Sequence, residues 1–292
     1  MGIDIHALNF LRYATRKQPL GGVATIGRQA LFVSRGELAK ITGVPKQEIN
    51  FGTYCEQLLM RYLGAASVDS YDYSDYEGAT HIVDMGKPMA WEREYDTVID
   101  SGCSEHIYNV PQALENISSL CRSGGQIIHI LPANNFCGHG FWQFSPELFF
   151  SLYSEDSGHT ETEVFLADLR NPNKWFEVKP PKDGKRAEVR SSGPLYVMCK
   201  TYKRSELFPK NVQQSDYIYT WDRASYAKQP QRGVIGALKR AIRSRHSLDR
   251  IAVSVVNFAK NHFGSLTNPI GLSKRNRHLR EFDVTELLTD YK

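Results

Sequence analysis

The chain has 292 residues, a formal net charge of +4, 41% hydrophobic residues and 23% charged residues. These values are ordinary for a globular protein that buries a core, and they exclude a low-complexity chain. Apolar runs such as Ile251–Val256 are too short to cross a bilayer, and the N-terminus has no unbroken apolar segment, so neither a membrane span nor a signal peptide is predicted. The five cysteines are scattered without a C-x-x-C pair, which argues against a disulfide framework or a zinc site and favours a reducing cytoplasm.

Five short β-rich runs occur before residue 132. They are GVATI at 22–26, SVDSY at 67–71, HIVD at 81–84, TVIDS at 97–101 and QIIHIL at 126–131. All but the second are nearly continuous apolar runs, which is typical of parallel strands covered on both faces.

Helical patterns lie between these runs. Residues 51–63 are apolar at helical spacing, and a helix over 109–122 is predicted with Asn109 as its N-cap and Gly124 after its end. A further helix is predicted from Ser145, because serine is a good N-cap and the next residue is proline.

The pattern changes after residue 159. Thr160–Leu169 and Leu195–Arg204 predict two strands with no room for a long helix between them, and therefore an antiparallel pair. Five parallel strands with crossover helices, closed by such a pair, describe a Rossmann-like doubly wound α/β sheet over residues 1–205. Residues 206–292 are predicted to form a basic, largely helical extension. Ligands of such sheets bind outside the carboxyl ends of the strands, near the switch point.

The first strand is followed by Gly27-Arg28-Gln29, which holds one glycine where a dinucleotide-binding loop has three. Arg28 either holds a ligand carboxylate near a helix N-terminus or is a solvated loop residue.

Acidic residues follow the second and third strands. Asp72 could accept the two hydroxyls of a ribose, although Asp75 and Glu77 compete for that role. Asp84 could accept from the exocyclic amine of an adenine, with Met85 packing on the ring. The alternative for both aspartates is an ordinary turn acid.

Histidines follow the fourth and fifth strands. His106 ends the loop that begins at Asp100, and it is either a general base or a histidine satisfied by hydrogen bonds under the sheet edge. Cys103, in the same loop, has no activating pattern and is interpreted as a loop residue. His139 lies among aromatic residues, which either form a substrate loop or pin the loop to the core.

These segments together resemble the class I S-adenosylmethionine-dependent methyltransferases. Asp72 and Asp84 match the acids that bind the ribose and the adenine in that family, YDTVIDSGCSEHIYN is similar to its fourth motif, and GGQIIHILP is similar to the glycine turn and strand that follow. The resemblance covers about residues 21–204. TIGRQ, DYSDYEGATHIVDM, SEHIYN and GHGFWQFSPELF resemble a bacterial branch associated with surface-glycan or natural-product synthesis.

The resemblance implies S-adenosylmethionine as cofactor and a hydroxyl of a sugar, glycan or other small metabolite as acceptor. It assigns His106 or His139 as the proton acceptor, no metal, and seven cofactor-binding residues: Gly27, Arg28, Gln29, Asp72, Asp84, Met85 and Ser101.

The first motif departs from the family, because its acid and two glycines are missing, and an insertion is predicted around Ser34–Gln47. The departure favours the alternative of a non-catalytic interaction or scaffolding protein. A nicotinamide-dependent oxidoreductase is a weaker interpretation, because the single glycine and the antiparallel closing pair both argue against it.

The positive charge is concentrated near the C-terminus, where residues 231–292 hold twelve Lys/Arg and five Asp/Glu. Gly233–Phe263 has apolar residues at helical spacing and a basic first half. The helix either packs on the body, lies on an anionic membrane surface or binds nucleic acid, although no nucleic-acid module is recognisable. The expected location is cytoplasmic, with peripheral membrane contact as one outcome.

Overall fold

The computed structural model describes residues 2–91, 93–182, 186–209, 211–219 and 270–288. The basic segment Gly233–Phe263, with its predicted helix and its membrane or nucleic-acid contacts, lies outside the described residues. Among the helices that are described, none combines the length and the hydropathy that crossing a membrane requires.

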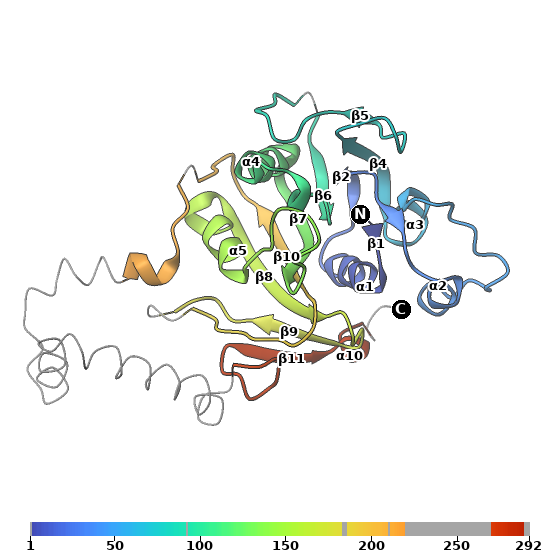
Figure 1. The fold of residues 1–292 in the computed structure, drawn as a ribbon. Helices are drawn as coiled ribbons and strands as arrows, with labels where there is room; N and C mark the ends of the chain where they lie inside the picture. The colour runs from blue at the N-terminus through green and yellow to red at the C-terminus, as the bar shows by residue number, and fades with distance from the viewer. Residues whose placement is uncertain (1, 92, 183–185, 210, 220–269, 289–292) are drawn as a thin grey trace, which may run out of the picture.

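The described chain is built on one sheet in the order β11-β9-β8-β10-β7-β6-β2-β4-β5, seen near the centre of Figure 1. Its strands are β2 (Gly21–Ile26), β4 (Ala65–Asp72), β5 (His81–Ile82), β6 (Tyr95–Ser101), β7 (Cys121–Asn134), β8 (His159–Asp168), β9 (Lys174–Val178), β10 (Leu195–Lys203) and β11 (Leu279–Asp283). A separate parallel pair joins β1 (Gly2–Ile3) to β3 (Ala30–Leu31).

The strand directions confirm the predicted fold class. β2, β4, β5, β6 and β7 pair in parallel, and β10 lies antiparallel between β7 and β8. The chain runs from β2 through β4 to β5 towards one edge and then continues with β6 and β7 on the other side of β2. The switch point, where ligands of such sheets bind, therefore lies between β2 and β6.

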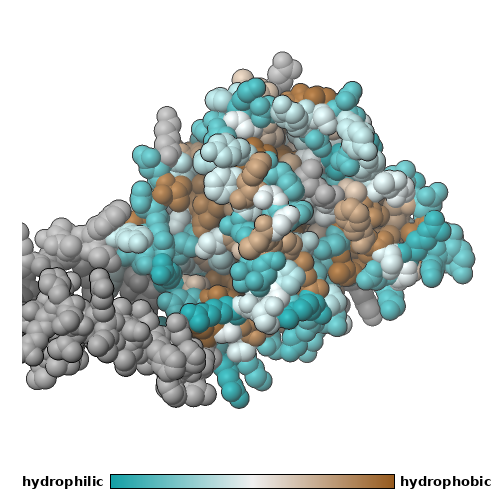
Figure 2. Space-filling model, viewed as in Figure 1, coloured by the Kyte–Doolittle hydropathy of each residue, from teal (hydrophilic) through white to brown (hydrophobic). Residues whose placement is uncertain are grey.

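Helices cover both faces of the sheet, and each face has its own hydrophobic core. The helices are α1 (Ile5–Ala14), α2 (Arg35–Thr42), α3 (Glu56–Tyr62), α4 (Val110–Leu120), α5 (Pro146–Leu152) and α10 (Val284–Leu288), with short 3-10 turns η1 (Ser104–His106) and η2 (Glu155–Ser157). α1 and α3 pack on one face, and α4 and α5 pack on the other (Figure 1). Hydrophobic residues on the face shown in Figure 2 lie in separate patches among hydrophilic ones.

Helix α4 begins differently from the sequence-based expectation. Asn109 makes no capping hydrogen bond to the helix, and its amide instead donates to the carbonyl of Gly86 at 2.9 Å. Asn109 therefore occupies the predicted N-cap position, because the helix begins at the next residue, but the predicted capping hydrogen bond is absent. Ser145 does cap α5, because its hydroxyl accepts from the backbone N–H of Glu147.

An inserted segment, residues 30–54 and called the excursion below, separates β2 from α3 at the place where an insertion was predicted. It leaves at Ala30, which forms an antiparallel bridge with Tyr54, and it contains β3 and α2. The backbone N–H of Cys55 donates to the carbonyl of Gln29 at 3.0 Å, so α3 begins beside the loop that follows β2. The excursion thus leaves the loop-to-helix junction in place and adds structure beside the switch point.

The end of the described chain returns to the sheet. β11 pairs with β9, and Val284 and Leu288 of α10 belong to the same core as α1. The division of the chain at residue 205 stays a prediction, but β11 and α10 are packed against residues from the first part.

Candidate functional site

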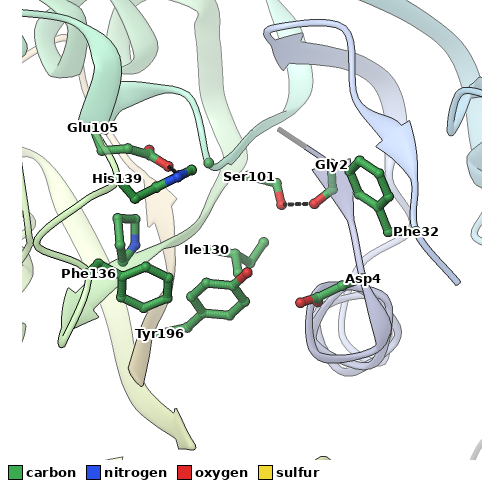
Figure 3. A pocket seen from close by; sticks show the side chains of 11 residues that line it. Gly2, Asp4, Phe32, Ser101, Glu105, Ile130, Phe136, His139 and Tyr196 are labelled. Carbon is green, nitrogen blue, oxygen red and sulfur yellow. Dashed lines mark hydrogen bonds and ion pairs between the residues drawn. The ribbon is translucent and has the colours of Figure 1, made fainter. Parts of the chain in front are cut away.

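A cavity of about 200 Å³ lies at the carboxyl ends of β6 and β7. It is lined by Gly2, Asp4, Phe32, Ser101, Gly102, Glu105, Ile130, Pro132, Phe136, His139 and Tyr196. In Figure 3, Glu105 and His139 lie on one side, Gly2, Asp4 and Phe32 on the other, and Ser101 between them. The cavity is therefore bounded by the strand ends on one side and by the N-terminal residues and the excursion on the other.

The two predicted catalytic histidines come together at Glu105. The Nε2 atom of His139 lies 3.3 Å from Oε1 of Glu105, and the Nε2 atom of His106 lies 3.8 Å from the same oxygen. The two imidazole rings are 4.9 Å apart between centroids and meet edge to face. Both histidines are exposed whereas Glu105 is buried, so the carboxyl group is the most deeply buried member of the cluster.

The loop that carries His139 is held against Glu105 by its backbone. The N–H groups of Phe141 and Trp142 donate to the Glu105 carbonyl at 2.7 and 3.2 Å. Gly140 has a φ of +69°, and a Cβ there would meet Glu105 atoms at 2.8 Å. Glycine is therefore needed at position 140 both for its backbone conformation and for the close approach of the loop.

Burial shapes the protonation of this cluster. Loss of solvation, and then the negative charge of Asp100, raise the pKa of the Glu105 carboxyl from 4.5 to about 8. Burial and the neighbouring His139 lower the pKa of His106, which keeps its imidazole neutral at physiological pH. The second oxygen of Glu105, Oε2, is buried without a hydrogen-bond partner. A neutral imidazole beside a protonated or shared carboxyl group is chemically able to accept a proton.

A second carboxyl–imidazole pair lies directly beneath this cluster. Asp100 is fully buried and accepts from the Ser104 hydroxyl at 2.6 Å and from Nδ1 of His129 at 3.0 Å. The Tyr153 hydroxyl lies 2.7 Å from Nε2 of His129. The backbone N–H groups of Cys103 and Ser104 also donate to Asp100, so this carboxylate fixes the loop on which Glu105 and His106 stand.

The acids predicted to bind a nucleoside lie at the ends of adjacent strands. Asp72 is half-buried and accepts from the backbone N–H groups of Arg28 and Tyr73 at 3.2 and 2.7 Å. Asp84 accepts from the N–H of Gly86 and forms an ion pair with Lys87, and Met85 is buried beside it. A carboxylate has about four acceptor positions, so both acids keep capacity for hydroxyl or amine groups of a ligand.

Arg28 and Gln29 are engaged by the protein itself. The Arg28 guanidinium forms an ion pair with Glu56, donates to the carbonyls of Glu77 and Gly78, and lies 4.1 Å from the centre of the Tyr54 ring. The alternative of a solvated loop arginine is therefore wrong. A role in binding a cofactor carboxylate stays a prediction, and it requires some of these contacts to be exchanged.

Gln29 is buried, and its amide donates to the carbonyl of Ile26 at 2.6 Å, which closes the turn after β2. Gly27, buried with a φ of +73°, donates its N–H to the carbonyl of Tyr71. The turn is thus built from one left-handed glycine and one internal glutamine contact instead of from three glycines.

Fit to S-adenosylmethionine differs between the two halves of that molecule. The free acceptor capacity of Asp72 and Asp84 suits the ribose and the adenine amine. After β2, the Arg28 guanidinium and the Gln29 amide nitrogen are already paired, and the Gln29 amide oxygen is buried without a partner. Of the predicted residues only Ser101 and His139 line the cavity, and the Ser101 hydroxyl donates to the Gly2 carbonyl at 3.1 Å. The nucleoside-side acids and the cavity therefore lie on the two sides of the switch point.

Several cavity residues had no signal in the sequence pattern. Gly2, Asp4 and Phe32 reach the cavity because β1 pairs with β3, which is a contact between segments distant in the sequence. Glu105 directly precedes the predicted catalytic His106 in the sequence. Only its burial, which the sequence does not show, distinguishes it from an ordinary loop acid.

Comparison with solved structures finds S-adenosylmethionine-dependent methyltransferases. The N-methyltransferase NodS from Bradyrhizobium japonicum WM9 is 11% identical with a TM-score of 0.38, covering 68% of this chain and 94% of that chain. The Burkholderia thailandensis 1,6-didemethyltoxoflavin-N1-methyltransferase, solved with S-adenosylhomocysteine, is 15% identical with a TM-score of 0.37, covering 69% and 78%. The sugar N-methyltransferase KedS8 from a Streptoalloteichus species is 13% identical with a TM-score of 0.29, covering 78% and 83%.

No protein-family model and no curated protein matches the chain. At these identities and scores, the fold assignment rests on the strand order and strand directions of the chain itself.

Proposed function

We propose that the protein is an S-adenosylmethionine-dependent methyltransferase acting on a hydroxyl group of a sugar or another small metabolite. One observation carries the proposal. Carboxylates with spare acceptor capacity follow the adjacent strands β4 and β5, and a carboxyl–imidazole cluster follows β6 across the switch point. The proposal therefore assigns nucleoside binding and proton acceptance to two groups of residues at the same end of the sheet.

When bound, the cofactor supplies a methyl group that its sulfonium centre already activates. The work left to the chain is to orient the acceptor oxygen and to remove its proton. His139 lines the cavity and His106 lies beside it, so we assign one of these two imidazoles as the acceptor of that proton. Glu105 orients the His139 ring, because its Oε1 atom lies 3.3 Å from Nε2 of His139, and it stabilises the imidazolium when its own carboxyl group is ionised, which its pKa of about 8 places at alkaline pH.

The surroundings of the cavity favour a small acceptor or the end of a larger one. About 200 Å³ is below the usual size of a cavity for a drug-sized ligand. Tyr108, Phe141 and Trp142 form an exposed aromatic group beside the cluster, with Tyr108 6.2 and 6.4 Å from the other two rings. Exposed rings of this kind give a sugar or a flat metabolite a surface to pack against.

A non-catalytic interaction or scaffolding protein is the second candidate. The observation that favours it is the loop after β2, where the Arg28 guanidinium and the nitrogen of the Gln29 amide are both occupied by protein contacts. Cofactor binding separates the two candidates, because a scaffold has no need of it.

The deciding experiment is a calorimetric titration of the folded protein with S-adenosylmethionine and S-adenosylhomocysteine. We expect saturable binding in the micromolar range, weakened at least about tenfold by Asp72→Asn and Asp84→Asn, since each removes a charge-assisted hydrogen bond to the nucleoside. Asp75→Asn is the matched control, because Asp75 is an exposed acid in the same turn.

Absence of binding to well-folded wild-type protein would favour the scaffold. Equal loss of binding in Asp72→Asn and Asp75→Asn would overturn the assignment of Asp72 to the ribose.

A further inference from the structure

Glu105, His106 and His139 form a compact group of three metal-ligating side chains. One ligand atom from each residue can be chosen so that all three atoms lie within 4.8 Å of one another. Glu105 and His106 are neighbours in the turn η1, and His139 comes from the loop after β7. The group thus joins two segments that follow adjacent strands of the sheet.

The separations match those of ligands around one ion. Two ligands bound to Zn²⁺ at about 2.0–2.1 Å and at a tetrahedral angle are about 3.3 Å apart. The measured separations from Oε1 of Glu105 are 3.3 Å to Nε2 of His139 and 3.8 Å to Nε2 of His106. The separation to His139 agrees with the tetrahedral value, whereas that to His106 is 0.5 Å longer, so the exposed His106 ring has to move closer to share the ion.

A second observation is independent of these distances. Glu105 is 1% exposed, and its Oε2 atom has no hydrogen-bond partner. Leaving a buried carboxyl oxygen unpaired is costly, and the cost is offset when a cation lies beside the group. Asp100, buried in the same loop, shows the contrast, because its two oxygens accept four hydrogen bonds.

We propose that Glu105, His106 and His139 bind a divalent first-row transition-metal ion. Two imidazole nitrogens and one carboxylate suit zinc, iron, cobalt or nickel, whereas magnesium and calcium prefer sites made of oxygen ligands. The sequence pattern predicted no metal, because adjacent Glu and His residues and one distant His match no ligand spacing of a known motif.

Three protein ligands leave at least one coordination position open, as in catalytic rather than structural zinc sites. Glu105 and His139 line the cavity and lie next to each other on one side of it (Figure 3), so an ion held by them would lie at the cavity wall. An ion placed there would coordinate the oxygen of a hydroxyl or water molecule in the cavity and lower its pKa. With both imidazoles coordinated, the ion would promote loss of the acceptor proton in place of His106 or His139, so the metal site replaces their role as proton acceptors and does not add to it.

The protein is first stripped of metal with a chelator, and the chelator is then removed. The test is a calorimetric titration of this protein with Zn²⁺ in the absence of cofactor and acceptor. We expect one Zn²⁺ per chain and little or no binding of Mg²⁺ under the same conditions. His139→Ala, His106→Ala and Glu105→Gln are each expected to weaken Zn²⁺ binding at least tenfold. His81→Ala is the matched control, because His81 is an exposed histidine outside the cluster, and it should leave binding unchanged.

Absence of Zn²⁺ binding, or binding that survives the two histidine substitutions, overturns the proposal. Those two side chains are 41% and 51% exposed, so their removal leaves the folded state intact and the result remains decisive even if Glu105→Gln does not fold. Because the titration contains no S-adenosylmethionine, its failure would not affect the proposed methyl transfer. Failure of cofactor binding would in turn leave the metal site standing.

Discussion

Two carboxyl–imidazole pairs follow one another at the end of β6, and they differ in how completely they are satisfied. Asp100 and His129 are wholly buried, and each has its polar atoms paired with Ser104, Tyr153 or backbone N–H groups. Glu105 and His139 have one long contact between them, an unpartnered carboxyl oxygen and an exposed ring.

The difference separates a structural role from a reactive one. A buried polar network with every member paired rigidifies the structure around it. A pair with unfilled capacity at the wall of a cavity can take a proton, a substrate or an ion without first breaking other contacts. The pair of Asp100 and His129, the lower pair, therefore supports the loop. The pair of Glu105 and His139, the upper pair, is the one presented to ligands.

The largest effect is expected from Asp100→Asn. Two donors share each carboxylate oxygen, and the NH2 group that replaces one oxygen accepts no hydrogen bond, so two donors to Asp100 lose their partner whichever oxygen is replaced. We expect a loss of about 3–5 kcal/mol in the free energy of unfolding, measured by urea denaturation. A loss below about 1 kcal/mol would show that the lower pair does not hold the loop.

A pH-dependent effect is expected from Glu105→Gln in the presence of a chelator. The pKa of Glu105 is raised from 4.5 when unfolded to about 8 when folded, so its contribution to stability is complete below pH 4.5 and is lost as the pH rises to 8. The difference in unfolding free energy between wild type and variant should fall by about 2–4 kcal/mol from pH 5 to pH 8. A pH-independent difference would mean that the folded carboxyl titrates normally.

A smaller effect is expected from Tyr153→Phe. The substitution keeps the ring against Phe149 and removes the hydroxyl that lies 2.7 Å from Nε2 of His129, which leaves that buried nitrogen unpaired. The expected loss is about 1–3 kcal/mol by urea denaturation. Tyr108→Phe, at an exposed tyrosine, is the control and should change stability by no more than about 0.5 kcal/mol.

The smallest effect on stability is expected from His106→Ala, because this ring is exposed. The free energy of unfolding should change by at most about 0.5 kcal/mol, while methyl transfer to a suitable acceptor falls about 100-fold or more if His106 is the base. Cofactor affinity should stay unchanged. Wild-type turnover in this variant would leave His139 as the proton acceptor.

The sequence predicted the sheet better than the site. Five parallel strands and the antiparallel pair were found because their apolar runs and bounding turns are local features. β4 and β6 extend the predicted runs by only a few residues, whereas β7 begins five residues before its predicted run and includes the predicted glycine turn. Asp72, Asp84, His106 and His139 were placed at strand ends for the same reason. What brings His106 and His139 together is the approach of two loops, which periodicity does not encode.

Other parts of the site depend on pairings between distant residues. The ion pair of Arg28 with Glu56 forms because the excursion returns to the loop after β2, and nothing near Arg28 in the sequence indicates it. The approach of the His139 loop to Glu105 depends on the hydrogen bonds that the Phe141 and Trp142 N–H groups donate to its carbonyl. Such contacts decide whether a polar residue is solvated, structural or reactive.

The position of Gly2 in the cavity wall has a practical consequence for every assay. Its carbonyl accepts from Ser101, and it belongs to the short pair of β1 with β3. Residues fused ahead of it would emerge beside the cavity and could screen or fill it, and a histidine tag there would bring its own metal ligands. Recombinant protein for binding measurements should therefore carry any purification tag at the opposite end, or have an amino-terminal tag removed before use.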